Sequence, residues 1–207
     1  MVSAGGEMTE NKFIDPRGIP IQDLPLIVLS DFSSGVIQSL IKIRTSGSFS
    51  HIMVMHRKDF FASQGNMFSE APLSRYMKDG NRLKFFSIKN LTEEERWALA
   101  KKMEKDLSAP WWQRFYDYPG ILGQAFGLRW FNSPFRAYCS ERVAAWLRVL
   151  PRMKNSIPLH PSPEDLNDLM KAEEKNFEFY GIWDSDLMAN MEVHNEVSGN
   201  IAGISPA

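Results

Sequence analysis

Short apolar or alternating stretches along the chain indicate β-strands. Five strands are predicted, at residues 24–31, 47–56, 60–64, 82–88 and 176–183. In the second of them, His51, Met53 and Met55 lie on one face because side chains alternate along a strand, and the intervening apolar residues lie on the other face. A charged turn follows this strand and leads directly into the third one, so these two strands are predicted to pair as an antiparallel hairpin.

Apolar residues recur at helical spacing in four further stretches, 32–45, 90–108, 138–150 and 162–175. Two of these helices carry start signals, because Thr92 begins a capping-box sequence and Ser162 precedes a proline in the first turn. The stretch 69–77 is predicted to be a loop with a short helical turn. The aromatic stretch 109–135 is predicted to be helical around 119–127. Strands and helices do not alternate regularly, which favours an α+β fold.

The 207 residues fit one domain, predicted at 21–183, between a flexible arm at 1–20 and a disordered tail at 184–207. Lys and Arg total 24 against 25 Asp and Glu, and this balance gives no electrostatic reason to expect nucleic acid as a partner. No stretch approaches the ~18 apolar residues of a membrane span. The N-terminus lacks the basic and apolar regions of a signal peptide. We therefore expect no transmembrane segment and no signal peptide.

Cys139 is the only cysteine, so the chain cannot form an internal disulfide. It begins a predicted helix on which Cys139, Val143 and Leu147 share the apolar face, whereas Glu141 and Arg142 lie on the polar side. The positive end of a helix dipole favours a thiolate, and the N–H groups of the first turn can stabilise an oxyanion. A cysteine that only packs in the core accounts for the same pattern, because free cysteine is among the most buried residue types.

A nucleophilic thiol needs a base, and the chain has four histidines. His51 opens a strand, where its side chain stands at the rim of a sheet and a helix N-terminus can approach it. His56 ends the same strand before a charged turn, His160 lies between prolines, and His194 lies in the predicted tail. His51 is therefore the preferred base. Because His51 and His56 fall on opposite faces of one strand, we predict no metal site, and we expect no cofactor.

A third polar residue would orient the imidazole ring of the histidine. The strand that follows offers Ser63 and Gln64, and Glu70 lies beyond them. Because strand faces alternate, Ser63 and Gln64 cannot both face His51. The register between the two strands decides which of them does.

Three stretches together resemble a known family: SGSFSHIMVM around His51, FFASQGNMFSEAPLSRYM after it, and YCSERVAAWL around Cys139. They look like the circularly permuted NlpC-type papain-like superfamily of cysteine hydrolases, which includes YiiX-like proteins. In ordinary NlpC-type enzymes the cysteine helix precedes the histidine strand, whereas in permuted members the histidine hairpin comes first, as it does here. The resemblance runs over roughly residues 24–182 and implies an antiparallel sheet packed against the cysteine helix.

The resemblance implies that Cys139 is the nucleophile and His51 the base. The third polar residue of the family matches Ser63 by ungapped spacing, or Gln64 with a slip of one residue. Gln64 is preferred because serine is a weak orienter, and Glu70 is a more distant choice that would lie near the substrate.

By the same resemblance, the protein is expected to be a thiol hydrolase, a peptidase or amidase that cleaves an amide or ester bond through an acyl-enzyme. Members act on cell-wall peptides and relatives act on acyl groups of lipids, so an acyltransferase or thioesterase with the same pair is a second interpretation. A degenerate module with a binding or virion-structural role is a third. The expected partner is a peptide or acyl-bearing substrate, and Tyr138 is expected to line its site. The protein is expected to be cytoplasmic or virion-associated, and a bacteriophage is a possible source.

Overall fold

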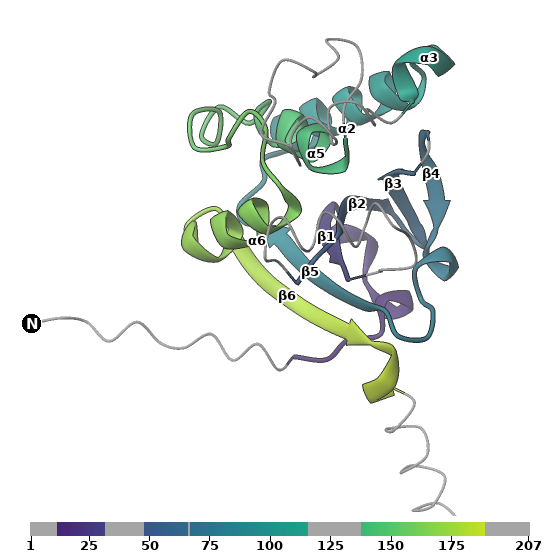
Figure 1. Cartoon of the computed structure of the whole chain (residues 1–207). Coiled ribbons are helices and arrows are strands. Elements are labelled where there is room, and N and C mark those ends of the chain that lie inside the picture. Colours follow the sequence, from purple (N-terminus) through teal and green to yellow (C-terminus); the bar gives the residue numbers. More distant parts are fainter. Residues whose placement is uncertain (1–11, 32–47, 66, 116–137, 189–207) are drawn as a thin grey trace, which may run out of the picture.

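A computed structural model describes residues 12–31, 48–65, 67–115 and 138–188, which form an α+β fold (Figure 1). Six strands make one antiparallel sheet in the order β4-β3-β2-β1-β5-β6. Their bounds are β1 Leu26–Ser30, β2 His51–Arg57, β3 Phe60–Gln64, β4 Phe68–Pro72, β5 Arg82–Ile88 and β6 Phe177–Asp184. All five predicted strands are therefore confirmed, and β2 and β3 form the expected antiparallel hairpin.

Two of the helices that follow β5 in the sequence, α2 and α6, carry the start signals that the sequence predicts. Thr92 and Ser162 each form a capping box with the residue three positions on, and Cys139 is the first residue of its helix. The bounds are α2 Glu93–Leu107, α3 Trp111–Arg114, α5 Cys139–Leu147 and α6 Pro163–Ala172, with short 3-10 helices η1 Pro16–Gly18, η2 Ile21–Asp23 and η3 Leu73–Arg75. No helix within the described ranges is long and apolar enough to cross a membrane.

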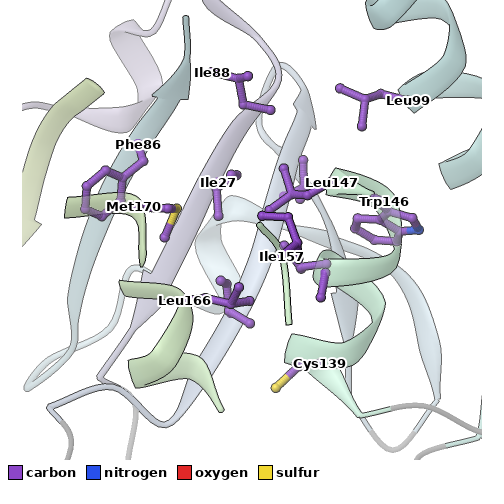
Figure 2. Packing of buried hydrophobic residues seen from close by; sticks show 14 of the residues in the cluster. Ile27, Phe86, Ile88, Leu99, Cys139, Trp146, Leu147, Ile157, Leu166 and Met170 are labelled. Carbon is purple, nitrogen blue, oxygen red and sulfur yellow. The ribbon is translucent and has the colours of Figure 1, made fainter. Parts of the chain in front are cut away.

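Both faces of the sheet are buried, so the core has two layers. The helix-side layer packs α2, α5 and α6 against the sheet and contains Ile52 and Val54 of β2. Trp146 of α5 belongs to the same layer (Figure 2). The opposite layer contains Met53 and Met55 of the same strand. The alternation predicted for β2 is therefore confirmed, with an apolar side chain buried on each side of the sheet.

β4 lies where the sequence pattern predicts a loop, over 69–77, so that prediction is wrong for this strand. β4 forms one edge of the sheet and pairs with β3 alone. An edge strand tolerates Glu70 and Pro72, which weaken the strand signal in the sequence, since one side of its backbone needs no partner. The predicted short turn follows β4 as η3, and it brings Tyr76 into the opposite layer of the core.

The sequence assigns residues 12–20 to a flexible arm, whereas the structure packs them against β6. The backbone N–H of Ile14 donates a 2.9 Å hydrogen bond to the carbonyl of Ile182. This close approach requires a glycine on β6, because a Cβ added to Gly181 would lie 2.6 Å from Cγ2 of Ile14. The folded domain therefore begins before residue 21.

Three other predictions lie wholly or partly outside the described residues. They are the helix at 32–45, the helix around 119–127 and the tail beyond Met188. The described start of the tail belongs to the fold, because β6 extends to Asp184 and Met188 packs against the opposite layer.

Candidate active site

Cys139 lies at the start of α5 with only 2% of its surface exposed. It belongs to the helix-side layer together with Val143 and Leu147, as its predicted face requires, and Figure 2 shows it at the end of that cluster. Ser140 Oγ donates a 2.6 Å hydrogen bond to the carbonyl of Pro161, which anchors the first turn of the helix. The positive potential at a helix N-terminus acts on a side chain in this position and favours a thiolate.

His51 is the first residue of β2, and its ring is held by two neighbours. Its Nε2 atom lies 2.9 Å from Oγ of Ser63 on β3. Its ring stacks on Tyr76, with the ring centroids 6.0 Å apart and the planes 9° from parallel. The hydroxyl of Tyr76 in turn forms a short hydrogen bond with Ser63 Oγ. The three side chains form one connected group, which fixes both the tilt of the imidazole and the nitrogen that Ser63 engages.

The surroundings of His51 keep its imidazole neutral. Burial lowers its pKa from 6.5 to about 4, and the positive charge of Arg75 acts in the same direction. A neutral imidazole at pH 7 is the form that can accept a proton. The site therefore holds a histidine in the base form.

Tyr76 links this group electrostatically to the cysteine helix. Burial raises the pKa of the Tyr76 hydroxyl, the hydrogen bond with Ser63 and the charge of Arg75 oppose this, and a negative charge on Cys139 raises the pKa further. Cys139 belongs to the helix-side layer with Ile52, whereas His51, the residue before Ile52 in β2, lies on the face that carries Met53. The imidazole itself contacts Ser63 and Tyr76.

Gln64, which the sequence analysis preferred as the orienting residue, faces away from His51. Its Nε2 donates a 3.0 Å hydrogen bond to the carbonyl of Arg114, and its Oε1 accepts a 2.9 Å hydrogen bond from Nε of Arg142 on α5. The register of the β2–β3 hairpin explains the correction, because alternate residues of β3 point to opposite layers and Ser63 is the one on the histidine side. Gln64 thus joins β3 to the cysteine helix.

Arg142 is also a correction, because helical periodicity placed it on the polar side of its helix. It is buried, with 7% of its surface exposed, and its guanidinium lies 3.7 Å from a carboxylate oxygen of Asp106 on α2. It also stacks over Phe68 at 4.4 Å. These partners come from distant parts of the chain, so the helix pattern alone cannot reveal that a charge is compensated there.

Glu70 and the other described histidines have their partners elsewhere. Glu70 lies 3.0 Å from Nε2 of His56 and 2.6 Å from Arg57, at the opposite end of β2 from His51, so it does not orient His51. His160 pairs with Glu141 at 2.5 Å on an exposed part of the surface. His194 lies outside the described residues.

Tyr138 and Tyr76 differ in how well the sequence indicates them. Tyr138 is buried at the N-cap of α5, next to the cysteine, as the sequence pattern suggests. The sequence does not indicate Tyr76, because the stretch 69–77 predicts a loop, whereas η3 brings Tyr76 into the core of the opposite layer. The hairpin pairing would have been needed to find it.

Two grooves border the turn between β2 and β3, far along the strand from the histidine. One of about 500 Å³ is lined by residues that include Pro25, Lys58 and Met103. The other, of about 630 Å³, is lined by residues that include Lys58 and Trp183. Neither is lined by His51 or Cys139. Within the described ranges, no group of three His, Cys, Asp or Glu side chains is placed to hold a metal ion.

A scan against protein-family models finds no match for this chain, and a search of curated proteins finds none either. The chemical interpretation of the site therefore rests on its own geometry. What the structure establishes about the fold is an α+β arrangement with a six-stranded antiparallel sheet and a few helices.

Proposed function

We propose that this protein is a thiol hydrolase, a peptidase or amidase that uses Cys139 as nucleophile and His51 as base. The observation that carries the proposal is the fixed imidazole of His51, which Ser63 and Tyr76 hold at the start of the strand over which the cysteine helix packs. A general base must present one nitrogen in a constant direction, and this arrangement provides that.

The proposed reaction begins with both partners neutral. Ser63 engages Nε2 of His51, so Nδ1 is the nitrogen that accepts the thiol proton of Cys139. The sulfur then attacks the carbonyl carbon of an amide or ester, and the tetrahedral oxyanion is stabilised by the N-terminal end of α5. Collapse of this intermediate expels the amine or alcohol, which takes the proton from His51. Water, deprotonated by the same nitrogen, attacks the thioester carbonyl; the C–S bond breaks, the acid is released, and the departing sulfur of Cys139 recovers the proton from His51.

The low pKa of His51 shapes this mechanism. An imidazole whose pKa is about 4 does not hold a stable ion pair with a thiolate at pH 7, so the proton moves as the sulfur attacks. The activity is then expected to rise at high pH as the thiol of Cys139 loses its own proton. Near neutral pH the activity is expected not to require a protonated histidine.

We further propose that the fold is the permuted NlpC-type papain-like one. The chain order supports this, because the histidine hairpin β2–β3 precedes the helix that starts at Cys139, and the sheet is antiparallel. A peptide or acyl-bearing substrate follows from that assignment. Analysis of the products formed from peptide and lipid ester substrates distinguishes a hydrolase from an acyltransferase or thioesterase with the same pair.

The test is the rate of alkylation of Cys139 by iodoacetamide, followed by mass spectrometry over a range of pH. We expect the rate near pH 7 to fall about tenfold in His51→Ala, because the base that assists ionisation is removed. His56→Ala is the matched control, since His56 lies on the same strand and pairs with Glu70 instead. Equal rates in the wild type and in both variants would overturn the proposal.

A second function is favoured by one observation, the near-complete burial of the thiol, with 2% of Cys139 exposed. On this interpretation the cysteine only packs, and the protein is a binding or virion-structural module. A thiol that reacts with iodoacetamide in urea but not in the native protein is the outcome that this alternative predicts.

A further inference from the structure

Arg75 differs from every other arginine that the structure describes. Eight of the nine have a carboxylate or carbonyl partner: Arg17, Arg57, Arg82, Arg96, Arg114, Arg142, Arg148 and Arg152. Arg75 is exposed, and among the described residues it has neither a hydrogen bond nor an ion pair. A guanidinium presents five donors, and because no described residue supplies an acceptor to that of Arg75, it can bind an anion from outside.

This side chain lies beside the candidate active site. Arg75 ends η3, and the next residue, Tyr76, stacks on the ring of His51. The Nη2 atom of Arg75 would lie 3.5 Å from a Cβ added to Gly65, so the guanidinium sits at the end of β3 that carries Ser63. Its positive charge acts on the pKa of both His51 and Tyr76, which agrees with this position.

We propose that Arg75 binds a carboxylate of the substrate next to the scissile bond, so that the protein acts on acidic peptides. This inference rests on the proposed hydrolase function and names its substrate class. The guanidinium presents a planar fork that matches the two oxygens of a carboxylate. A single cation beside the histidine provides one such contact, which is enough to select among peptides by the charge near the bond.

The experiment compares two reagents that alkylate Cys139, the anionic iodoacetate and the neutral iodoacetamide. Both rates depend equally on ionisation of the thiol, so their ratio isolates the attraction between the reagent's carboxylate and nearby positive charge. The ratio is measured by mass spectrometry at low ionic strength in the wild type, Arg75→Gln and Arg75→Lys. Arg57→Gln is the matched control, because it removes the same charge at the far end of β2, where Arg57 pairs with Glu70.

We expect the ratio of the iodoacetate rate to the iodoacetamide rate to fall about threefold in Arg75→Gln. The ratio should stay unchanged in Arg75→Lys and in Arg57→Gln. In the wild type it should decrease at high salt. A ratio unchanged in Arg75→Gln, with Cys139 still reactive, overturns the carboxylate site and leaves the proposed hydrolase standing. Failure of both reagents to label native Cys139 overturns the hydrolase and the inference together. The two failures are therefore distinguishable.

Discussion

Ser63 lies 2.9 Å from Nε2 of His51 through its hydroxyl oxygen, and that hydroxyl is itself hydrogen-bonded to Tyr76. The serine is buried, with 2% of its surface exposed, so water does not compete for the imidazole nitrogen. A serine alone orients an imidazole ring only weakly. When a buried tyrosine fixes the serine hydroxyl, that hydroxyl can point in only one direction. The ring of His51 is thereby oriented by two residues that act together.

Removing the Ser63 hydroxyl should leave the imidazole ring of His51 without a fixed orientation. We expect Ser63→Ala to slow the reaction of Cys139 with iodoacetamide near pH 7 by about tenfold, since a small misplacement of a catalytic group has effects of this size or larger. Tyr76→Phe keeps the stacked ring and should have a smaller effect in the same direction.

Ser63→Thr, which retains a hydroxyl, is expected to preserve most of the rate. Glu70→Gln serves as the control, because Glu70 pairs with His56 and Arg57 and should leave the rate unchanged. A Glu70→Gln rate that falls as far as that of Ser63→Ala would contradict the assignment of Ser63.

The stability of the protein should depend on pH through His51. Burial lowers the pKa of His51 from 6.5 to about 4, so the unfolded chain binds a proton more readily than the folded protein. The contribution of the neutral histidine is complete above about pH 6.5 and is lost as the pH falls toward 4. We expect a loss of up to about 3 kcal/mol in the free energy of unfolding over this window.

Urea unfolding at a series of pH values measures this dependence. His51→Gln cannot be protonated and should lose less stability on acidification than the wild type. His160→Gln is the control, because His160 is exposed and pairs with Glu141 at the surface. Parallel pH profiles for the wild type and His51→Gln would show that another group governs the acid sensitivity.

The buried Arg142 should matter more for stability than its helical position suggests. Arg142→Ala removes the partner of Gln64 and one partner of Asp106. We expect a loss of about 3 kcal/mol, because breaking a buried ion pair leaves polar groups uncompensated. Arg148→Ala, on the same helix and half-buried, should cost less than about 1 kcal/mol. Chemical unfolding followed by far-UV circular dichroism provides both values, and equal losses would argue against a role for the network.

The contact between the N-terminal segment and β6 can be tested at a glycine. Gly181→Ala would place a methyl group 2.6 Å from Cγ2 of Ile14, so we expect it to cost about 1–3 kcal/mol and to make residues 12–20 more sensitive to proteolysis. Gly18→Ala has open space around the new methyl group and should change neither property. Limited proteolysis with mass spectrometry measures the accessibility of the segment, and identical digestion of both variants would contradict the packing.

Much of the fold could be predicted from the sequence, because local signals dominate in its regular elements. The alternation in β2 places Met53 and Met55 on one side of the sheet and Ile52 on the other, and Thr92 and Ser162 mark the helix starts. β4 could not be predicted in this way, since an edge strand needs no continuous apolar pattern. The packing of residues 12–20 on β6 depends on a long-range contact that leaves no periodic signal.

The residues of the candidate site also differ in whether local sequence signals or long-range contacts reveal them. Cys139 and His51 stand out because each begins an element and carries reactive chemistry. The choice between Ser63 and Gln64 depends on strand register, and the burial of Arg142 depends on Asp106 from another helix. The positions of Tyr76 and Arg75 beside His51 depend on β4 and η3, which the sequence pattern does not predict as a strand and turn against the sheet.

The strand order has a consequence for how the molecule assembles during synthesis. β1 to β4 lie side by side in the sheet in the order of the sequence, and the group formed by His51, Ser63 and Tyr76 comes from these strands and the η3 turn that follows them. Contacts between neighbours in sequence form faster than distant ones. We therefore expect the imidazole to be fixed while the helix bearing Cys139 is still emerging from the ribosome, so that reactivity appears only when the C-terminal half docks.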